Sequence, residues 1–166
     1  MNFIIREMRA EEYPVLEEFL YQAIFVPEGQ IPPPRSILQN AELRVYLDDF
    51  GTGYADFAIA AESDGRIAGA VWVRDMHDYG HVEDGVPSFA ISVLPEYRGC
   101  GAGSAMMCGM LELLVKRGFD RASLAVQKAN YALRMYKKLG FEIVDENEEE
   151  YIMICNLNLY NGRNAT

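Results

Sequence analysis

The chain has 166 residues, half of them hydrophobic, so it is long enough to bury a core as one domain and too apolar to be disordered. Its formal net charge of -10 argues against nucleic acid and anionic membranes as partners. The charge is compatible with a cationic substrate, although an acidic, soluble surface is the simpler explanation.

The three cysteines, Cys100, Cys108 and Cys155, form neither a disulfide framework nor the paired spacing of a zinc site. We therefore expect no metal and a cytoplasmic location. No apolar run approaches the roughly 18 residues of a membrane span. The first residues also lack the layout of a signal peptide, so we expect no membrane association.

The N-terminal part begins with a predicted strand over residues 2–8. A helix is predicted over residues 10–25, because its apolar residues recur at the spacing of one helix face. Prolines end this helix in residues 27–34. A second helix is expected over residues 36–50, with Ser36 as its N-cap.

A hairpin is predicted next, with strands over residues 55–62 and 66–74. The turn between them contains Asp64-Gly65, a pair that suits the positive dihedral angles of a tight hairpin turn. A polar connector, residues 75–85, leads to a further apolar strand over residues 88–94.

The C-terminal part continues with a long helix, a strand over residues 122–126 and a short helix over residues 130–139. Two strands follow, near residues 141–144 and 151–157. This order predicts an α/β fold with a central, partly antiparallel sheet and helices on both faces. We expect a single domain over residues 1–161 and a frayed tail over residues 162–166.

A glycine-rich run, Arg98-Gly99-Cys100-Gly101-Ala102-Gly103-Ser104, joins the strand at residues 88–94 to the long helix. The first amides of a helix lack internal partners and the helix dipole favours negative charge there. Because glycine has no Cβ, a phosphate has room to approach the backbone there. The run therefore predicts a site for a phosphate-bearing cofactor.

Two common phosphate motifs fit this run poorly. A P-loop needs a lysine after its last glycine, whereas Gly103 is followed by Ser104 and Ala105. The dinucleotide fingerprint needs a third glycine where Ser104 stands.

The run resembles the acetyl-CoA signature of the GNAT N-acetyltransferases, with Arg98, Gly101 and Gly103 at its key positions. A second block, residues 130–141, is similar to the family's Asn…Tyr-x-Lys-Leu-Gly-Phe segment. The resemblance implies a mixed, mostly antiparallel sheet whose strands 4 and 5 splay apart to admit the pantetheine arm. It also implies acetyl-CoA as cosubstrate.

The resemblance assigns the cofactor-binding residues. The amides of residues 99–104 would hold the pyrophosphate, and the strand backbone at Ile91 and Val93 would pair with the pantetheine arm. An amide near Val93 would polarise the thioester carbonyl. The full set is Ile91, Val93, Arg98, Gly99, Cys100, Gly101, Ala102, Gly103, Ser104 and Asn130. Asn130 is equally an ordinary N-cap, and Cys100 is interpreted as a filler.

Two residues are expected to handle protons. By resemblance, Tyr136 donates a proton to the leaving thiolate; a core aromatic is the alternative role. The base is expected in the connector, where Glu83 is our choice among several acids and histidines, with Ser88 as a holder of water.

These features predict an N-acetyltransferase that acts on a primary amine of a small molecule or peptide, by direct transfer in a ternary complex. Residues 25–36 and 75–85 should line the acceptor site. A catalytically weak acyl-CoA sensor and an interaction module are the alternatives. A homodimer is possible through the C-terminal strands, and no nucleic acid or membrane partner is expected.

Overall fold

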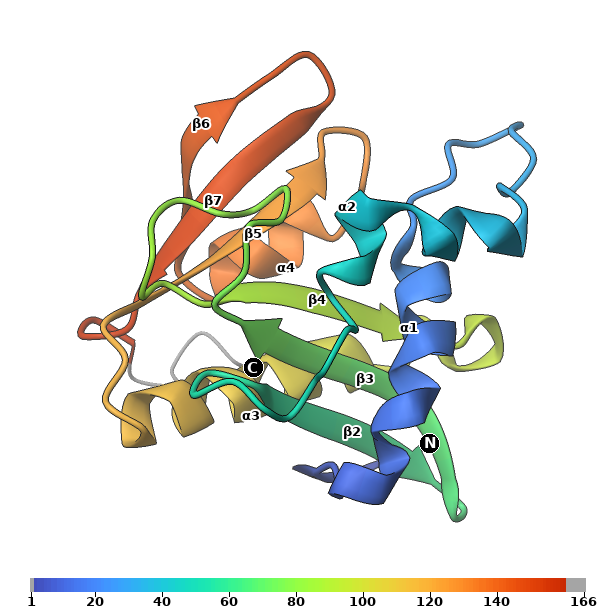
Figure 1. Ribbon diagram of the computed structural model, residues 1–166, viewed down its shortest axis with the longest axis horizontal. Coiled ribbons are helices and arrows are strands. Elements are labelled where there is room, and N and C mark those ends of the chain that lie inside the picture. The colour runs from blue at the N-terminus through green and yellow to red at the C-terminus, as the bar shows by residue number, and fades with distance from the viewer. Residues whose placement is uncertain (1, 161–166) are drawn as a thin grey trace.

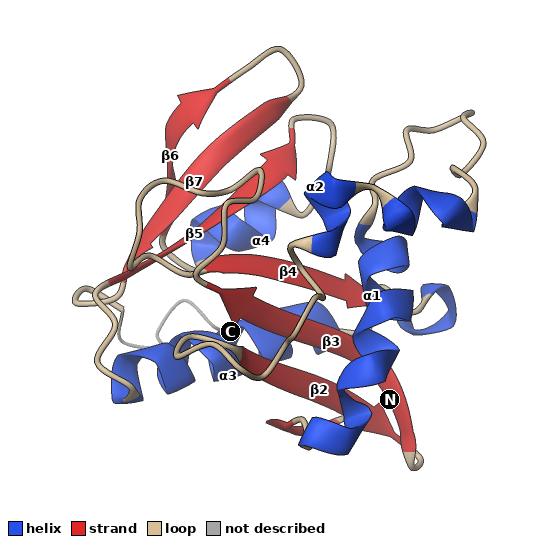
Figure 2. Ribbon diagram, viewed as in Figure 1, coloured by secondary structure: helices blue, strands red, loops and turns tan. Residues whose placement is uncertain are grey.

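The computed structural model describes residues 2–160, which form one seven-stranded sheet with helices on both sides (Figures 1 and 2). The strand order is β1-β2-β3-β4-β5-β7-β6. The strands are β1 (Ile4–Glu7), β2 (Phe57–Ser63), β3 (Arg66–Arg74), β4 (Ser88–Val93), β5 (Arg121–Gln127), β6 (Phe141–Glu146) and β7 (Glu150–Asn156). The α-helices are α1 (Leu16–Ala23), α2 (Ala41–Arg44), α3 (Ala102–Lys116) and α4 (Leu133–Lys138).

The sheet is antiparallel except between β4 and β5, which run parallel. Their only registered pair is Ser88 with Ser123, at the beginning of β4. Beyond this pair the two strands separate, whereas β4 stays paired with β3 along its length. The mixed fold and the splay of the fourth and fifth strands are therefore confirmed.

The alternation of side chains along β2 and β3 divides the core into two layers. On one face, branched residues of the sheet pack against the methionines and leucines of α3. On the other face, alanines and Trp72 pack under α1 and the segment around α2. Trp72 is fully buried, and its indole N–H donates to the carbonyl of Tyr46 at 3.1 Å. The small alanines allow the N-terminal helices to lie close to the sheet.

The hairpin expected around Asp64-Gly65 is confirmed. Asp64 and Gly65 have φ angles of 50° and 76°, so both lie in the left-handed region that this turn type requires. The short helix and the last two strands also occur where they were expected, with shifts of a few residues at their ends.

The two N-terminal helices differ from the prediction. The first begins as a 3-10 helix, Ala10–Val15, which contains Pro14, and becomes α-helical only at Leu16. The expected helix over residues 36–50 is wrong, since a 3-10 turn, Arg35–Gln39, is followed by the four-residue α2. Asn40, with extended dihedral angles, separates them and occupies the N-cap position assigned to Ser36.

No helix within residues 2–160 combines the length and apolar character needed to cross a bilayer. The expected tail, residues 162–166, lies outside the described residues.

Candidate functional site

The glycine-rich turn connects β4 to α3 through a short 3-10 helix, Pro95–Tyr97. Gly99 and Gly101 have φ angles of 76° and 87°, and Gly101 is the N-cap of α3. The carbonyl of this N-cap residue accepts a helical hydrogen bond from the amide of Ala105, at 3.1 Å. The amides of the preceding residues thus point out of the helix end, where an anion can accept from them.

The three glycines of this turn occur for different reasons, so room for a phosphate, the reason expected from the sequence, does not account for all three. Gly99 and Gly101 are required by their positive φ angles, because other residues adopt this conformation at a cost. A Cβ at either position would meet nothing within 4 Å, so the space above the turn is open. Gly103 is helical, and a Cβ there would lie 3.7 Å from Met135 Sδ of α4.

The free edge of β4 faces the gap left by β5. Leu94 donates from its amide to the carbonyl of Ala68 at 2.8 Å, on the β3 side. Because backbone groups alternate between the two sides of a strand, the amides of Ile91 and Val93 point away from β3, into the gap. They have no strand partner there, since β4 pairs with β5 only at Ser88. These two amides can bind an extended ligand as a neighbouring strand would.

Arg98 turns back toward the end of β4. Its Nε donates to the carbonyl of Val93 at 2.9 Å, and one terminal nitrogen lies 3.3 Å from the side-chain oxygen of Gln22 in α1. Arg98 is exposed, so its charge stays beside the glycine turn while it connects β4 to α1. Cys100 is exposed as well, with its Sγ 3.6 Å from the carbonyl of Arg98.

Tyr136 lies on α4 next to Met135, whose Sδ would be 3.7 Å from a Cβ on Gly103 in the first turn of α3. Its side chain is only 7 % exposed, and its ring meets Phe141 edge-on with centroids 6.0 Å apart. Burial raises the pKa of Tyr136 to about 12, so its hydroxyl keeps its proton at neutral pH. Tyr136 is therefore both a core aromatic and a protonated acid near the proposed cofactor site.

Asn130 precedes α4, and its side-chain oxygen accepts from the amide of Ala132 at 3.0 Å. This bond forms a local turn before α4, whose N-cap is Ala132, so the N-cap role considered as the alternative for Asn130 is wrong. The arrangement leaves the side-chain NH₂ group of Asn130 available to a ligand.

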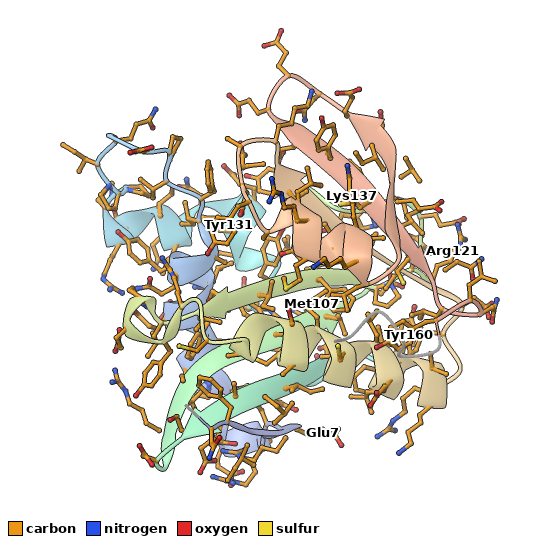
Figure 3. The ribbon with its side chains drawn as sticks, turned by 180° about the vertical axis from the view of Figure 1, so that it is seen from behind. Glu7, Met107, Arg121, Tyr131, Lys137 and Tyr160 are labelled. Carbon is orange, nitrogen blue, oxygen red and sulfur yellow. The ribbon has the colours of Figure 1, made fainter. Side chains whose placement is uncertain are left out.

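The structure does not place Glu83 at the gap. Its carboxylate pairs with Arg121 at the beginning of β5, before β4 and β5 separate. Figure 3 shows Arg121 at the edge of the molecule away from the first turn of α3. The choice of Glu83 as base is thus corrected, because the connector folds so that this residue faces the wrong end of β5.

Asp78 is the connector carboxylate that bonds to Ser88, where β4 and β5 are paired and beyond which they separate. Its Oδ1 accepts from the hydroxyl of Ser88 at 2.7 Å, on the α1 and α2 side of the sheet, and Tyr46 also bonds to it. Burial raises the pKa of Asp78, while these hydrogen bonds oppose the rise. Ser88, expected to hold a water, holds this carboxylate instead.

The connector is fixed to β5 next to Asp78. Ser123 donates from its hydroxyl to the carbonyl of Gly80 at 2.7 Å, and a Cβ on Gly80 would lie 2.9 Å from the amide nitrogen of Ala125. Only glycine allows this close approach. No local pattern in the sequence indicates that Asp78 is the connector acid with these partners, because they come from distant segments.

Two shallow depressions, with volumes of about 370 and 560 Å³, lie away from the glycine turn. The first is lined by residues that include Arg74, Asp56 and Tyr54, and the second by residues that include Arg35 and Glu18. Neither contains the β4 amides or Tyr136, so they are distinct from the site described above. Within residues 2–160, a group with the donor set of a metal site occurs at His77, His81 and Asp84.

Comparison with known proteins agrees with this geometry. The model of the "Acetyltransferase (GNAT) family" matches residues 7–141. A mycothiol acetyltransferase of Clavibacter sepedonicus is 34 % identical over 88 residues, which cover 52 % of this chain and 27 % of the relative. The [ribosomal protein bS18]-alanine N-acetyltransferase of Haemophilus influenzae is 34 % identical over 70 residues, which cover 42 % and 48 %. The chain thus spans less than half the length of each of these relatives.

Solved structures match over nearly the whole chain. The ribosomal-protein-S18-alanine N-acetyltransferase from Escherichia coli has a TM-score of 0.66 at 17 % identity and covers 98 % of both chains. The PaiA N-acetyltransferase from Thermoplasma acidophilum, in complex with coenzyme A, has a TM-score of 0.68 at 17 % identity and covers 94 % of this chain and 99 % of that one. The family model spans β2 to β5, the glycine turn and α4, so the chain belongs to the GNAT acetyltransferase family.

Proposed function

We propose that this protein transfers an acetyl group from acetyl-CoA to an amine. The observation that carries the proposal is the pair of β4 amides, at Ile91 and Val93, which face an open gap directly before a glycine turn and a helix N-terminus. A ligand with amide groups at one end and a pyrophosphate at the other suits this combination. Acetyl-CoA has this layout.

In the proposed complex, the pyrophosphate accepts from the amides of residues 99–104, and the pantetheine arm pairs with β4. The α3 dipole favours the negative charge of the pyrophosphate. The thioester carbonyl accepts from an amide near Val93, which stabilises the oxyanion as the amine attacks. Asn130 offers its side-chain NH₂ group to the arm.

The proposed transfer is direct. The neutral amine nitrogen attacks the thioester carbon, the C–S bond breaks, and the hydroxyl of Tyr136 donates its proton to the leaving thiolate sulfur. The amine passes its own proton to water, and water then reprotonates Tyr136. The high pKa of Tyr136 supports this role, because the group remains protonated until the thiolate forms.

The acceptor is proposed to approach from the α1 and α2 side. Asp78 lies on that side at the beginning of the gap. Burial raises the pKa of Glu150, with smaller contributions from the negative charges of Glu149 and Asp78. Negative charge here favours a cationic amine of a small molecule or a peptide. The relatives include a mycothiol acetyltransferase and an acetyltransferase of an alanine in ribosomal protein bS18, so both small-molecule and protein acceptors occur among them.

The first test is a calorimetric titration of the protein with acetyl-CoA, with Gly101→Asp as the site variant. An added carboxylate at the α3 N-terminus should abolish binding by repelling the pyrophosphate. Gly29→Asp is the matched control, because Gly29 has a similar φ of 82° and equally open space. Folded wild-type protein that binds no acetyl-CoA would contradict the proposal.

A screen for thiol release then separates an enzyme from a sensor. Binding followed by amine-dependent release of coenzyme A supports acetyl transfer. Binding without release from any primary amine, cationic or neutral, would favour the sensor instead.

A further inference from the structure

The only two histidines of the chain lie together in the connector between β3 and β4. The rings of His77 and His81 stack with centroids 4.1 Å apart and an interplanar angle of 25°. Both Nε2 atoms face the same oxygen, Oδ1 of Asp84, at 3.3 Å and 3.6 Å. The three ligand atoms lie within 4.8 Å of one another. Both histidines of this short segment thus lie beside one carboxylate oxygen.

The spacing of these atoms matches the edges of a metal coordination shell. Distances of 3.3 and 3.6 Å exceed the usual length of an N–H···O bond, which is about 2.9 Å. In a tetrahedral zinc site, bonds of about 2.0 Å place neighbouring ligand atoms about 3.3 Å apart. Two edges of the cluster, from each Nε2 to Oδ1 of Asp84, therefore have the length expected between ligands of one ion. The stacked rings direct their Nε2 lone pairs nearly in parallel, so the exposed ring of His77 has to turn about its side-chain bonds for both nitrogens to bind that ion.

The tautomer of His81 is also suited to a metal. Its Nδ1 lies 3.0 Å from the carbonyl oxygen of Met76, which can only accept, so Nδ1 carries the proton. A neutral ring then presents the lone pair of Nε2 toward an anionic oxygen of Asp84. A metal ion, or a proton on Nε2, is needed between two such acceptors. A backbone carbonyl that orients a histidine in this way is typical of metal-binding histidines.

We propose that Nε2 of His77, Nε2 of His81 and the carboxylate of Asp84 bind one divalent transition-metal ion. Two imidazoles and one carboxylate are the donor set that zinc accepts, with a fourth position left to water. We expected no metal because the cysteine spacing fits no zinc site, whereas the ligands proposed here are two histidines and an aspartate within one loop. The inference is independent of the proposed acetyl transfer.

The ion would close a loop in the connector. His77 and Asp84 are exposed and stand on either side of Asp78 and Gly80, which contact β4 and β5. Binding at both ends of this segment restricts its unfolded conformations, so metal should stabilise the folded protein. Because two of the three ligands are exposed, exchange of the ion with solvent is expected to be fast.

The test is a titration of tag-free protein with Zn²⁺ in competition with a chromophoric chelator, repeated with Co²⁺ for its absorption spectrum. Wild-type protein should bind one ion per chain, with the intense visible bands of tetrahedral Co²⁺. Loss of a partner that only orients a ligand costs about 10- to 100-fold in affinity, so His77→Ala and Asp84→Asn should each weaken binding by at least as much.

Glu83→Gln is the matched control, because it removes a neighbouring carboxylate of the same connector that pairs with Arg121. This variant should bind as tightly as wild type. Zinc should also raise the melting temperature of wild-type protein and of Glu83→Gln, but not of Asp84→Asn. No binding at micromolar Zn²⁺, or equal affinity in wild type, His77→Ala and Asp84→Asn, would overturn the proposal.

Discussion

The side chain of Tyr136 is surrounded by apolar residues and has one polar atom, the hydroxyl oxygen. Its ring packs edge-on against Phe141 and belongs to the same buried cluster as the methionines of α3. Burial alone raises its pKa to about 12, so the proton is retained across the physiological range. A group that keeps its proton this firmly suits donation to a basic thiolate and is unsuited to act as a base.

We predict that Tyr136→Phe lowers kcat about 100- to 1,000-fold, as expected for loss of a general acid. The ring and its packing remain, so the melting temperature and the affinity for acetyl-CoA should not change. Thiol release measured at saturating acetyl-CoA checks the rate, and calorimetry checks binding. An unchanged kcat would leave Tyr136 with a packing role only.

Glu12 is a second residue whose environment changes its titration. Two hydrogen bonds of 2.8 Å join its carboxylate to the guanidinium of Arg6, which also bonds to Glu62 at 2.7 Å. The bonds from Arg6, with a further bond from the amide of Arg9, lower the pKa of Glu12 to about 2. The arrangement ties β1 and β2 to the first 3-10 helix.

We predict that Glu12→Gln destabilises the protein by about 1 kcal/mol at pH 7, a value discounted for solvent screening of the pair. A lowered pKa in the folded state contributes stability above the usual pKa of about 4.5, and this contribution disappears as the pH falls toward 2. Urea unfolding at pH 7 and pH 3 should show a difference between variant and wild type that shrinks at the lower pH. A constant difference would point to packing.

At the scale of elements, the site results from three neighbouring features: the free edge of β4, the N-terminus of α3 and the first turn of α4. The β4 edge is free because β5 leaves it after Ser88. The end of α3 is accessible because Gly99 and Gly101 turn the chain away from it. The side chain of Met135 lies beside Gly103, which places this part of α4 near the first turn of α3.

We predict opposite effects from two alanine substitutions in this turn. Gly101→Ala should destabilise the protein by about 1 kcal/mol, because its φ of 87° strains a residue with a Cβ. Gly103→Ala should keep or slightly increase stability, since Gly103 is helical and a Cβ there makes an ordinary contact. Its affinity for acetyl-CoA should fall if a phosphate approaches that backbone. Thermal unfolding and calorimetry of both variants measure these effects.

At the scale of the whole molecule, the sheet lies between two apolar layers. Its branched side chains pack into the layer with α3, and its alanines and Trp72 pack into the layer with α1. The layer with α3 contains most of the large buried residues, and the layer with α1 is centred on Trp72. The proposed acetyl-CoA site opens between the layers where the sheet splits. Both layers therefore have to be folded for the site to exist.

We predict that both layers unfold together as a single domain. Trp72 is the only tryptophan, so its fluorescence reports the α1 layer, whereas far-UV circular dichroism reports all helices and strands. The two transitions in urea should coincide. An earlier loss of fluorescence would show that the N-terminal helices unfold separately and would contradict the single-domain expectation.

Much of the fold could be predicted from local patterns. The hairpin at Asp64-Gly65, the strand before the glycine turn and the amphipathic α3 each follow from neighbouring residues. The splay of β4 and β5 came from the resemblance to a family and not from spacing. The break at Asn40 was missed, because short helices depend on tertiary packing more than on propensity.

The sequence by itself determined the glycine turn, its place between a strand and a helix, and the presence of Tyr136 in the following block. These depend on φ angles and periodicities that act over a few residues. Only the tertiary structure decided which connector acid reaches the gap, since Asp78 meets Tyr46 and Ser88 while Glu83 meets Arg121. Burial and ion pairing arise from residues far apart in the chain, and no local pattern records which of them will meet.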